Sequence, residues 1–121
     1  MAGASTGMSL GNIHLPQFNG KNYDYSSITM KALFVSQDLW ELVEDGFEEP
    51  ANEVEFLLLT HAERESLKNN KKRDAKALFF LYQAVHESVF PRIATAKRSK
   101  EAWETLKTTY QGMEKVKTTK L

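Results

Sequence analysis

The stretch that decides the fold is ALFFLYQAVHESVF, residues 77–90. Its apolar side chains recur at intervals of three and four residues, which brings them onto one face of an α-helix. The predicted apolar face holds Leu78, Phe79, Tyr82, Val85, Val89 and Phe90. Because Phe80 and Leu81 widen this face beyond a single stripe, we predict a central helix that is contacted on several sides.

The start and the end of this central helix carry recognisable signals. Thr60 and Glu63 form a capping-box pattern, in which the hydroxyl and the carboxylate each bind the other residue's backbone amide. The pair Asn69-Asn70 is a weak point for a helix, so the sequence leaves open one helix or two over residues 62–90. Pro91 stops the helix or begins a further one-turn helix.

A first helix is predicted over residues 23–37, with Asn22 as its candidate N-cap. Its expected buried stripe is Ile28, Ala32, Val35 and Leu39, at helical spacing, with Leu33 and Trp40 widening it. We expect a short helix to follow and to stop before Gly46. Residues 46–55 are then predicted to form an acidic loop.

A last clear helix is predicted over residues 99–111, with Ser99 as its N-cap and Gly112 as its C-cap. Its apolar side chains are Trp103, Leu106 and Tyr110. No stretch alternates apolar and polar residues as a half-buried strand does, so we predict an all-α bundle of about five helices. The predicted buried residues include Trp40, Leu78, Phe79, Tyr82, Trp103 and Leu106.

The chain of 121 residues suits one domain, and its composition of 41% hydrophobic and 26% charged residues is ordinary for a globular protein. We expect that domain over residues 13–112, beginning with an extended segment anchored by Leu15 and Phe18. Residues 1–12 are expected to be a flexible leader, and residues 113–121 the start of a following helix or a linker. No apolar run is long enough to span a bilayer and cysteine is absent, so we predict no membrane partner and an intracellular, cytoplasmic protein.

The formal net charge of zero conceals two halves of opposite charge. Residues 1–60 carry two basic and nine acidic residues, a net charge of −7, and residues 61–121 carry fourteen basic and seven acidic residues, a net charge of +7. The acidic residues concentrate within 41–55, and one basic cluster lies within 68–76. This asymmetry predicts an electrostatically oriented contact with a partner.

The sequence contains no residue pattern typical of a catalytic or metal-binding site. His14, His61 and His86 are too far apart for paired metal ligands, and His86 is better explained at the edge of the core. There is no cysteine nucleophile, serine-nucleophile turn or phosphate loop. We therefore predict a non-enzyme without cofactor or metal. The aromatic candidates for an exposed groove or interface are Tyr23, Tyr25, Phe47 and Phe56.

Nucleic-acid binding is a competing interpretation of the segment KNNKKRDAK, residues 68–76. Its cations are Lys68, Lys71, Lys72, Arg73 and Lys76. These side chains can neutralise phosphates, but no aromatic residue lies among them to stack on bases, and the domain as a whole is neutral. We therefore predict at most weak RNA contact from this segment.

Three segments carry a resemblance to a known family: LPQFNGKNYDY at 15–25, ITMKALFVSQDLWELVEDGFEEP at 28–50, and residues 75–112 from AKALFFLYQ to TTYQG. They resemble the N-terminal part of plant copia-type LTR retrotransposon Gag polyproteins. The resemblance implies a capsid-like helical fold, self-assembly into particles and packaging of RNA. It also implies that a later helical region and a Cys/His zinc knuckle, the usual RNA contact, follow residue 121.

One departure from the family's pattern lies at Ser26. The family usually has a tryptophan two or three residues after an Asn-Tyr pair, where this chain has Tyr25, Ser26 and Ser27. If that tryptophan is a core residue, either Ser26 leaves a void or Tyr25 fills it.

The leading hypothesis is therefore a structural Gag domain that binds other copies of itself. A head-to-tail contact would place the acidic residues of one copy against the basic residues of the next, an arrangement that generates rings or open arrays. The acidic candidates are Glu44, Asp45, Glu48 and Glu49, and the basic candidates are Lys71, Lys72, Arg73 and Lys76. The alternatives are a host-adopted module that binds a protein or peptide, and a weak RNA-binding domain.

Overall fold

The computed structural model describes residues 17–112. Its elements are α1 (Tyr23–Ser36), α2 (Trp40–Asp45), α3 (Glu53–Leu57), α4 (His61–Ala84), α5 (Phe90–Ile93), α6 (Ser99–Leu106) and the π-helical turn η3 (Lys107–Gln111). Within this range there is no strand, only an isolated bridge between Phe18 and Val85. The all-α prediction is confirmed, with six α-helices rather than about five.

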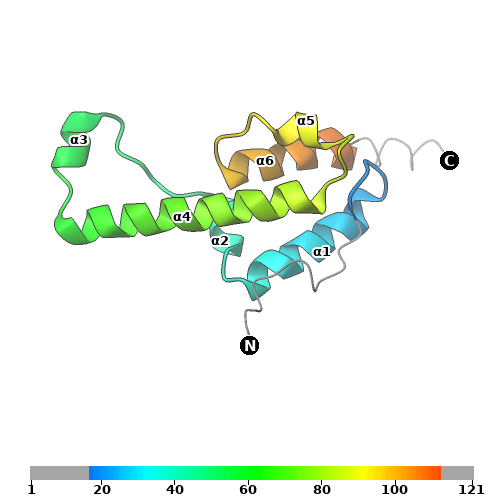
Figure 1. Cartoon of the computed structure of the whole chain (residues 1–121), viewed down its shortest axis with the longest axis horizontal. Coiled ribbons are helices and arrows are strands. Elements are labelled where there is room, and N and C mark those ends of the chain that lie inside the picture. The colour runs from blue at the N-terminus through cyan, green and yellow to red at the C-terminus, as the bar shows by residue number, and fades with distance from the viewer. Residues whose placement is uncertain (1–16, 113–121) are drawn as a thin grey trace.

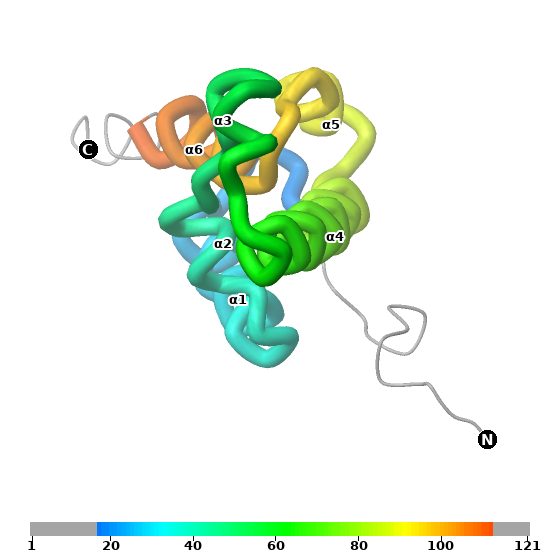
Figure 2. The backbone as a smooth tube through the Cα atoms, turned by 90° about the vertical axis from the view of Figure 1, so that its left-hand side faces the viewer, coloured from blue at the N-terminus to red at the C-terminus, as the bar shows by residue number. Residues whose placement is uncertain are grey.

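The helices gather around the C-terminal half of α4 (Figure 1). Viewed from the end of the molecule, α1 lies on one side of α4 and α5 lies on the other (Figure 2). α3 and the first turns of α4 extend beyond this body (Figure 1). We call residues 50–70 the arm, because α3 and the start of α4 within it stand clear of the other helices.

The buried face of α4 is Ala77, Phe80, Leu81 and Ala84, at i, i+3, i+4 and i+7. It is rotated relative to the predicted face. Phe79 is 52% exposed, so its predicted burial is wrong, and Phe90 is exposed as well. Leu78 and Tyr82 are half-buried against the core, as is Trp40, while Trp103 and Leu106 are buried as predicted.

The predicted stripe of α1 is also turned outward. Ile28 is 70% and Val35 57% exposed, and Ala32 is exposed too. Of the predicted residues, Leu39, which follows the helix, and Leu33, which was expected to widen the stripe, are buried. The residues that α1 buries are Tyr23, Met30, Leu33 and Phe34. Both stripes have helical spacing, and packing against α4, α2 and η3 selects the second.

Tyr23 was predicted as an interface residue, but it lies in the core with 2% of its surface exposed. Its ring meets that of Phe18 edge to face, with ring centres 5.7 Å apart. Burial, reinforced by the charges of Glu104 and Asp24, raises the pKa of Tyr23 to about 12. Tyr23 therefore acts as a neutral core residue, which excludes it as an interface candidate.

Ser26 lies half-buried on the inner side of α1, three residues after Tyr23 and four before Met30. Tyr25 is 55% exposed and does not fill that place. Its exposure agrees with the predicted interface role, as does the 38% exposure of Phe56, whereas Phe47 is half-buried. The departure from the family pattern thus puts a small side chain on the inner side of the helix.

α4 is a single helix through Asn69-Asn70, but it ends at Ala84 and not near Phe90. The backbone of Phe18 causes this end. The Phe18 amide donates to the Ala84 carbonyl at 2.9 Å, and the His86 amide donates to the Phe18 carbonyl at 2.8 Å. Val85 is extended between them, so tertiary hydrogen bonds replace the next helical turn.

The predicted caps have mixed outcomes. The capping box is confirmed, because the Glu63 amide donates to Thr60 Oγ1 and the Thr60 amide donates to Glu63 Oε1. Asn22 precedes α1 in a left-handed conformation with φ 55° and makes no side-chain cap bond, so that prediction is wrong. Gly112 follows η3 with right-handed helical angles and provides no left-handed stop.

The predicted acidic loop contains helical structure. Asn52 caps α3 by accepting a hydrogen bond from the Glu55 amide at 2.9 Å. The short helix before Gly46 is confirmed as α2, and Pro91 does open a one-turn helix, α5. Phe18 anchors the N-terminal segment as predicted, whereas Leu15, the leader and residues 113–121 lie outside the described residues.

Candidate interaction surfaces

Glu49 joins the acidic segment to the body of the same molecule. Its Oε1 lies 2.9 Å from Nη2 of Arg98, and its Oε2 lies 3.5 Å from Nζ of Lys71. Arg98 also donates to the Phe47 carbonyl at 2.9 Å and stacks on the Phe47 ring, 4.0 Å from its centre. One predicted acidic–basic pair is therefore formed within the chain.

Two effects act on the pKa of the Glu49 carboxyl. Desolvation raises it, and the hydrogen bond and charge of Arg98, followed by those of Lys71, lower it more. The net result is a pKa below the usual value. The Glu49 carboxylate is thus already paired with cations of its own chain.

Arg73 is likewise occupied inside the molecule. It donates to Oε1 of Glu41 at 3.2 Å and to the Asp38 carbonyl at short range. These contacts tie α4 to the turn between α1 and α2, and they leave 27% of the Arg73 side chain exposed. Arg73 thereby has a structural role that its position in a basic run did not predict.

The remaining predicted charges lie toward solvent. Glu44, Asp45 and Glu48 are exposed on α2 and the segment after it. Lys68 and Lys72 are exposed on α4, whereas Lys76 is half-buried. The acidic and basic candidates therefore divide into a set already engaged in the chain and a set on the surface.

A groove of about 480 Å³ lies between residues 48–59 and the first turns of α4. Its apolar lining is Pro50, Leu58, Leu59 and Leu67, and its carboxylates are Glu48, Glu49, Glu55 and Glu63, with Ser66 and Asn70 completing it. The groove therefore has an apolar lining with carboxylates beside it. The sequence pattern marked its acidic residues but missed the leucines, because FLLL at 56–59 has no helical period of its own.

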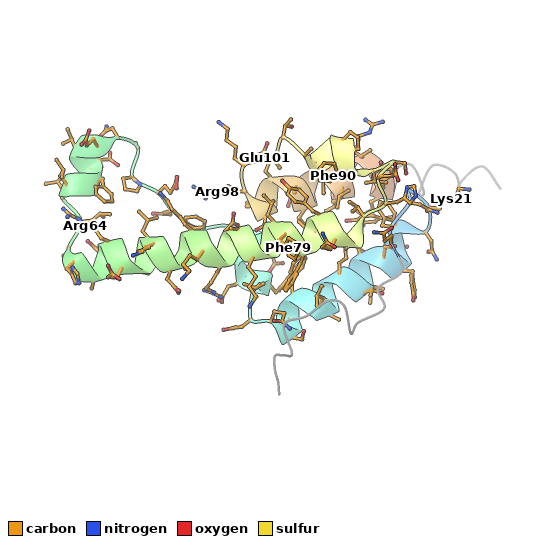
Figure 3. All side chains as sticks on the ribbon, viewed as in Figure 1. Lys21, Arg64, Phe79, Phe90, Arg98 and Glu101 are labelled. Atoms are coloured by element: carbon orange, nitrogen blue, oxygen red, sulfur yellow. The ribbon has the colours of Figure 1, made fainter. Side chains whose placement is uncertain are left out.

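Arg64 fixes the arm that forms one side of this groove. It donates to the Leu57 carbonyl at 3.0 Å and lies over the Phe56 ring, 5.0 Å from its centre. In Figure 3 Arg64 lies beside α3, far along α4 from Phe79. Together with the capping box, these contacts hold α3 against the first turn of α4 while Leu57 and Leu58 stay 60% and 78% exposed.

The outer face of α1 is a second apolar surface. Tyr25, Ile28 and Val35 are each more than half exposed and recur at helical spacing. Such a row on one helix is more than the scattered exposed apolar residues of an ordinary surface. Ile28 and Val35 belong to the stripe that its spacing predicted to be core, whereas Tyr25 was a predicted interface residue.

Asp74 and Ser99 form a buried polar pair that sequence reasoning missed. Asp74 is 5% exposed, and its Oδ1 accepts a 2.6 Å hydrogen bond from Ser99 Oγ. The Ser99 amide also donates to this carboxylate, at 3.2 and 3.3 Å. Arg98 holds the cap position of α6, so Ser99 is its first residue rather than its N-cap. The carboxylate of α4 takes over the capping task. The one sign of this pair in the sequence is Asp74, a single acidic residue within the basic run KKRDAK at 71–76.

The histidines and acidic residues among residues 17–112 form no metal-binding cluster. No group of three or more His, Asp or Glu side chains there lies close enough to hold a metal ion. His86 is exposed rather than at the core edge, and its Nδ1 accepts a hydrogen bond from the Ser88 amide at 3.1 Å. None of the helices in that range is both long enough and apolar enough to cross a membrane.

The described residues form an all-α body with apolar side chains exposed on α1 and α3. Residues 30–121 match the family model of the gag-polypeptide of LTR copia-type elements. The chain therefore belongs to the copia-type Gag polypeptide family, as its resemblance implied, and this family is generally non-catalytic. Neither the curated proteins nor the solved structures contain a significant match.

Proposed function

We propose that this chain is a non-catalytic structural Gag domain that binds further copies of itself in the assembly of a retrotransposon particle inside the cell. Its family membership supports this role. The observation that carries the proposal is the outer face of α1, where Tyr25, Ile28 and Val35 expose apolar surface. Covering that face with a second copy removes it from water, which is the general driving force of protein association.

The charges orient this self-association. The head-to-tail arrangement places the acidic candidates of one copy near the basic candidates of the next. Glu49, Lys71 and Arg73 are already paired within the chain. We therefore assign the acidic side of the contact to the exposed residues Glu44, Asp45 and Glu48. Exposed pairs contribute about 0–1 kcal/mol each, so they set orientation and association rate more than affinity.

Sedimentation velocity across a concentration series tests this function. We expect the sedimentation coefficient of the unaltered chain to rise with concentration. Val35→Lys places a charge on the outer face of α1 and should weaken association about tenfold, since an apolar contact is lost and a charge is buried. Val54→Lys is the matched control, because Val54 on α3 is also more than half exposed, at 67%. Equal effects of the two variants would contradict a contact through α1.

The same series separates the alternatives. A chain that stays monomeric at every concentration supports the host-adopted module and refutes self-association. RNA binding through Lys68 and Lys72 stays a prediction. It should be weak and fall steeply with salt because it depends on counterion release. A second series with RNA measures it, and tight binding that persists at high salt would overturn the structural role as the main one.

A further inference from the structure

We propose that the groove between residues 48–59 and the first turns of α4 binds residues 113–121 of a second copy of this chain. The inference rests on the proposed self-association and names a contact for its acidic side. Val116 and Leu121 are assigned to the apolar lining, and the lysines of the segment to the carboxylates around it. The groove thus receives a basic segment with apolar side chains at intervals.

The groove keeps a negative charge that its own molecule does not cancel. Glu55 and Glu63 accept hydrogen bonds from the Ala51 and Thr60 amides, which orient their carboxylates but carry no formal positive charge. Glu48 is exposed on the same groove. Among the groove's carboxylates, Glu49 is the one that pairs with cations of residues 17–112. An anionic ligand such as RNA is repelled by this arrangement, and a basic one is attracted.

The apolar lining means that a ligand with charged groups alone would leave the leucines of the groove exposed to water. Leu58 is 78% exposed beside the carboxylates, and Leu59 and Leu67 continue the lining toward α4. A ligand that covers these leucines gains from burying apolar surface. The fitting partner therefore carries both lysine and aliphatic side chains.

Residues 113–121 have this composition. Their sequence is MEKVKTTKL, with three lysines and one glutamate. Val116 lies between Lys115 and Lys117, and Leu121 follows Lys120. Each aliphatic residue thus has a lysine beside it, which matches leucines that have carboxylates beside them. The basic stretch of α4 is a poorer fit, because Lys71 already contacts Glu49 of its own molecule.

The geometry keeps Val116 of this segment away from the groove of its own copy. Tyr110 packs on Phe18, with ring centres 4.9 Å apart, and the Phe18 amide binds the carbonyl of Ala84 at the end of α4. The groove lies at the other end, where Leu67 is about 26 Å from Ala84 along the helix at 1.5 Å per residue. Figure 1 shows the last described turns of the chain and α3 at opposite ends of the molecule.

An extended chain covers at most about 3.5 Å per residue. Val116 therefore reaches about 14 Å beyond Gly112, and the whole nine-residue segment about 31 Å. Val116 therefore cannot reach the leucines of its own groove, and at full stretch only the last residues of the segment come near them. We assign the groove to the segment of a second copy, and such a contact is head-to-tail, as the proposed assembly requires.

The first test measures binding of an acetylated, fluorescently labelled peptide MEKVKTTKL to the full chain by anisotropy at low salt. We expect saturable binding that Glu48→Lys weakens about three- to tenfold, and Leu58→Ser about tenfold. Glu87→Lys is the charge control, because Glu87 is exposed beyond the end of α4 and outside the groove, and it should have less effect. Phe79→Ser is the apolar control, because Phe79 is 52% exposed on α4 and does not line the groove.

A second peptide, MEKSKTTKS, keeps every charge and loses both aliphatic residues. Binding of the two peptides with equal affinity, or equal sensitivity to Glu87→Lys and Glu48→Lys, would show unspecific attraction and overturn the inference. Absence of saturable binding overturns it as well. Stronger binding of the unaltered peptide, lost on Glu48→Lys and Leu58→Ser, supports it.

The second test uses sedimentation of full-length variants and separates this inference from the proposed function. We expect Glu48→Lys and the pair Lys115→Glu with Lys117→Glu each to weaken association, and the combination of all three to restore it. If the chain associates but none of these variants changes its association, the groove contact is wrong and self-association stands. If the chain stays monomeric while the peptide binds selectively, the groove's preference for a basic aliphatic segment stands, but its occupation by a second copy and self-association are both refuted.

Discussion

Asp74→Ala provides the sharpest test of how the body of this domain is held together. The substitution removes the acceptor for Ser99 Oγ and for the Ser99 amide, both of which are buried. A hydrogen bond to a charged group contributes about 1.5–3 kcal/mol, and an anion at a helix N-terminus about 0.3–1 kcal/mol more. These terms favour a large loss of stability.

An opposing term reduces the loss. Burying a carboxylate costs free energy of desolvation, and alanine removes that cost. The orphaned hydroxyl and amide of Ser99 nevertheless remain without water, at about 1–3 kcal/mol. We expect a net loss of about 2–3 kcal/mol in the free energy of unfolding. For a domain of this size that is a fall of roughly 8–15 °C in Tm.

Urea unfolding followed by far-ultraviolet circular dichroism and by the fluorescence of Trp40 and Trp103 measures this loss. Glu65→Ala is the control, since Glu65 is an exposed acid on the same helix and should change stability by less than about 0.5 kcal/mol. Ser99→Ala should restore part of the loss in the double variant, because it deletes the orphaned hydroxyl. A change below about 0.5 kcal/mol for Asp74→Ala would refute the assigned role of this pair.

Three further predictions test the orientation of the helices and the titration of the core. Phe80→Ala should destabilise the domain by about 3–5 kcal/mol and Phe79→Ala by less than about 1 kcal/mol in thermal unfolding, because only Phe80 is buried; equal losses would contradict the observed rotation of α4. Ser26→Trp should keep or raise Tm, since the larger side chain recovers buried area at about 25 cal/mol per Å² on the inner side of α1; a clear fall would mean that the neighbours have no room. The pKa of Tyr23 is raised from 10.0 to about 12, so its contribution to stability is complete below pH 10 and is lost as the pH rises to 12. Denaturant unfolding of Tyr23→Phe should therefore lose less stability over that range than the unaltered chain, and parallel curves would argue against this titration.

The sequence by itself determined the helical class and most of the helix positions. Intervals of three and four residues, the capping box at Thr60 and the breaks at Gly46 and Pro91 all act within one or two turns of chain. Such local signals need no knowledge of the rest of the molecule. The family could be inferred for the same reason, because its marks are short runs of residues in a fixed order.

Which face of each helix turns inward was decided only by the tertiary structure. α1 and α4 carry apolar residues around much of their circumference, so Ile28 and Phe79 fit a buried stripe as well as Met30 and Phe80 do. Neighbouring helices select one stripe, and the backbone of Phe18 ends α4 six residues before its pattern does. These contacts join segments far apart in the chain, which periodicity within a helix does not encode.

The same division holds for the candidate surfaces. The sequence located the acidic and basic clusters, because charge is a property of composition. Whether a charge faces a partner or its own chain depends on the path of the backbone, which returns Arg98 to Glu49 across 49 positions. The groove arises in the same way, since its leucines and carboxylates come from segments that only the folded arm brings together. Local interactions chose the helices, and long-range packing chose what each helix presents to solvent.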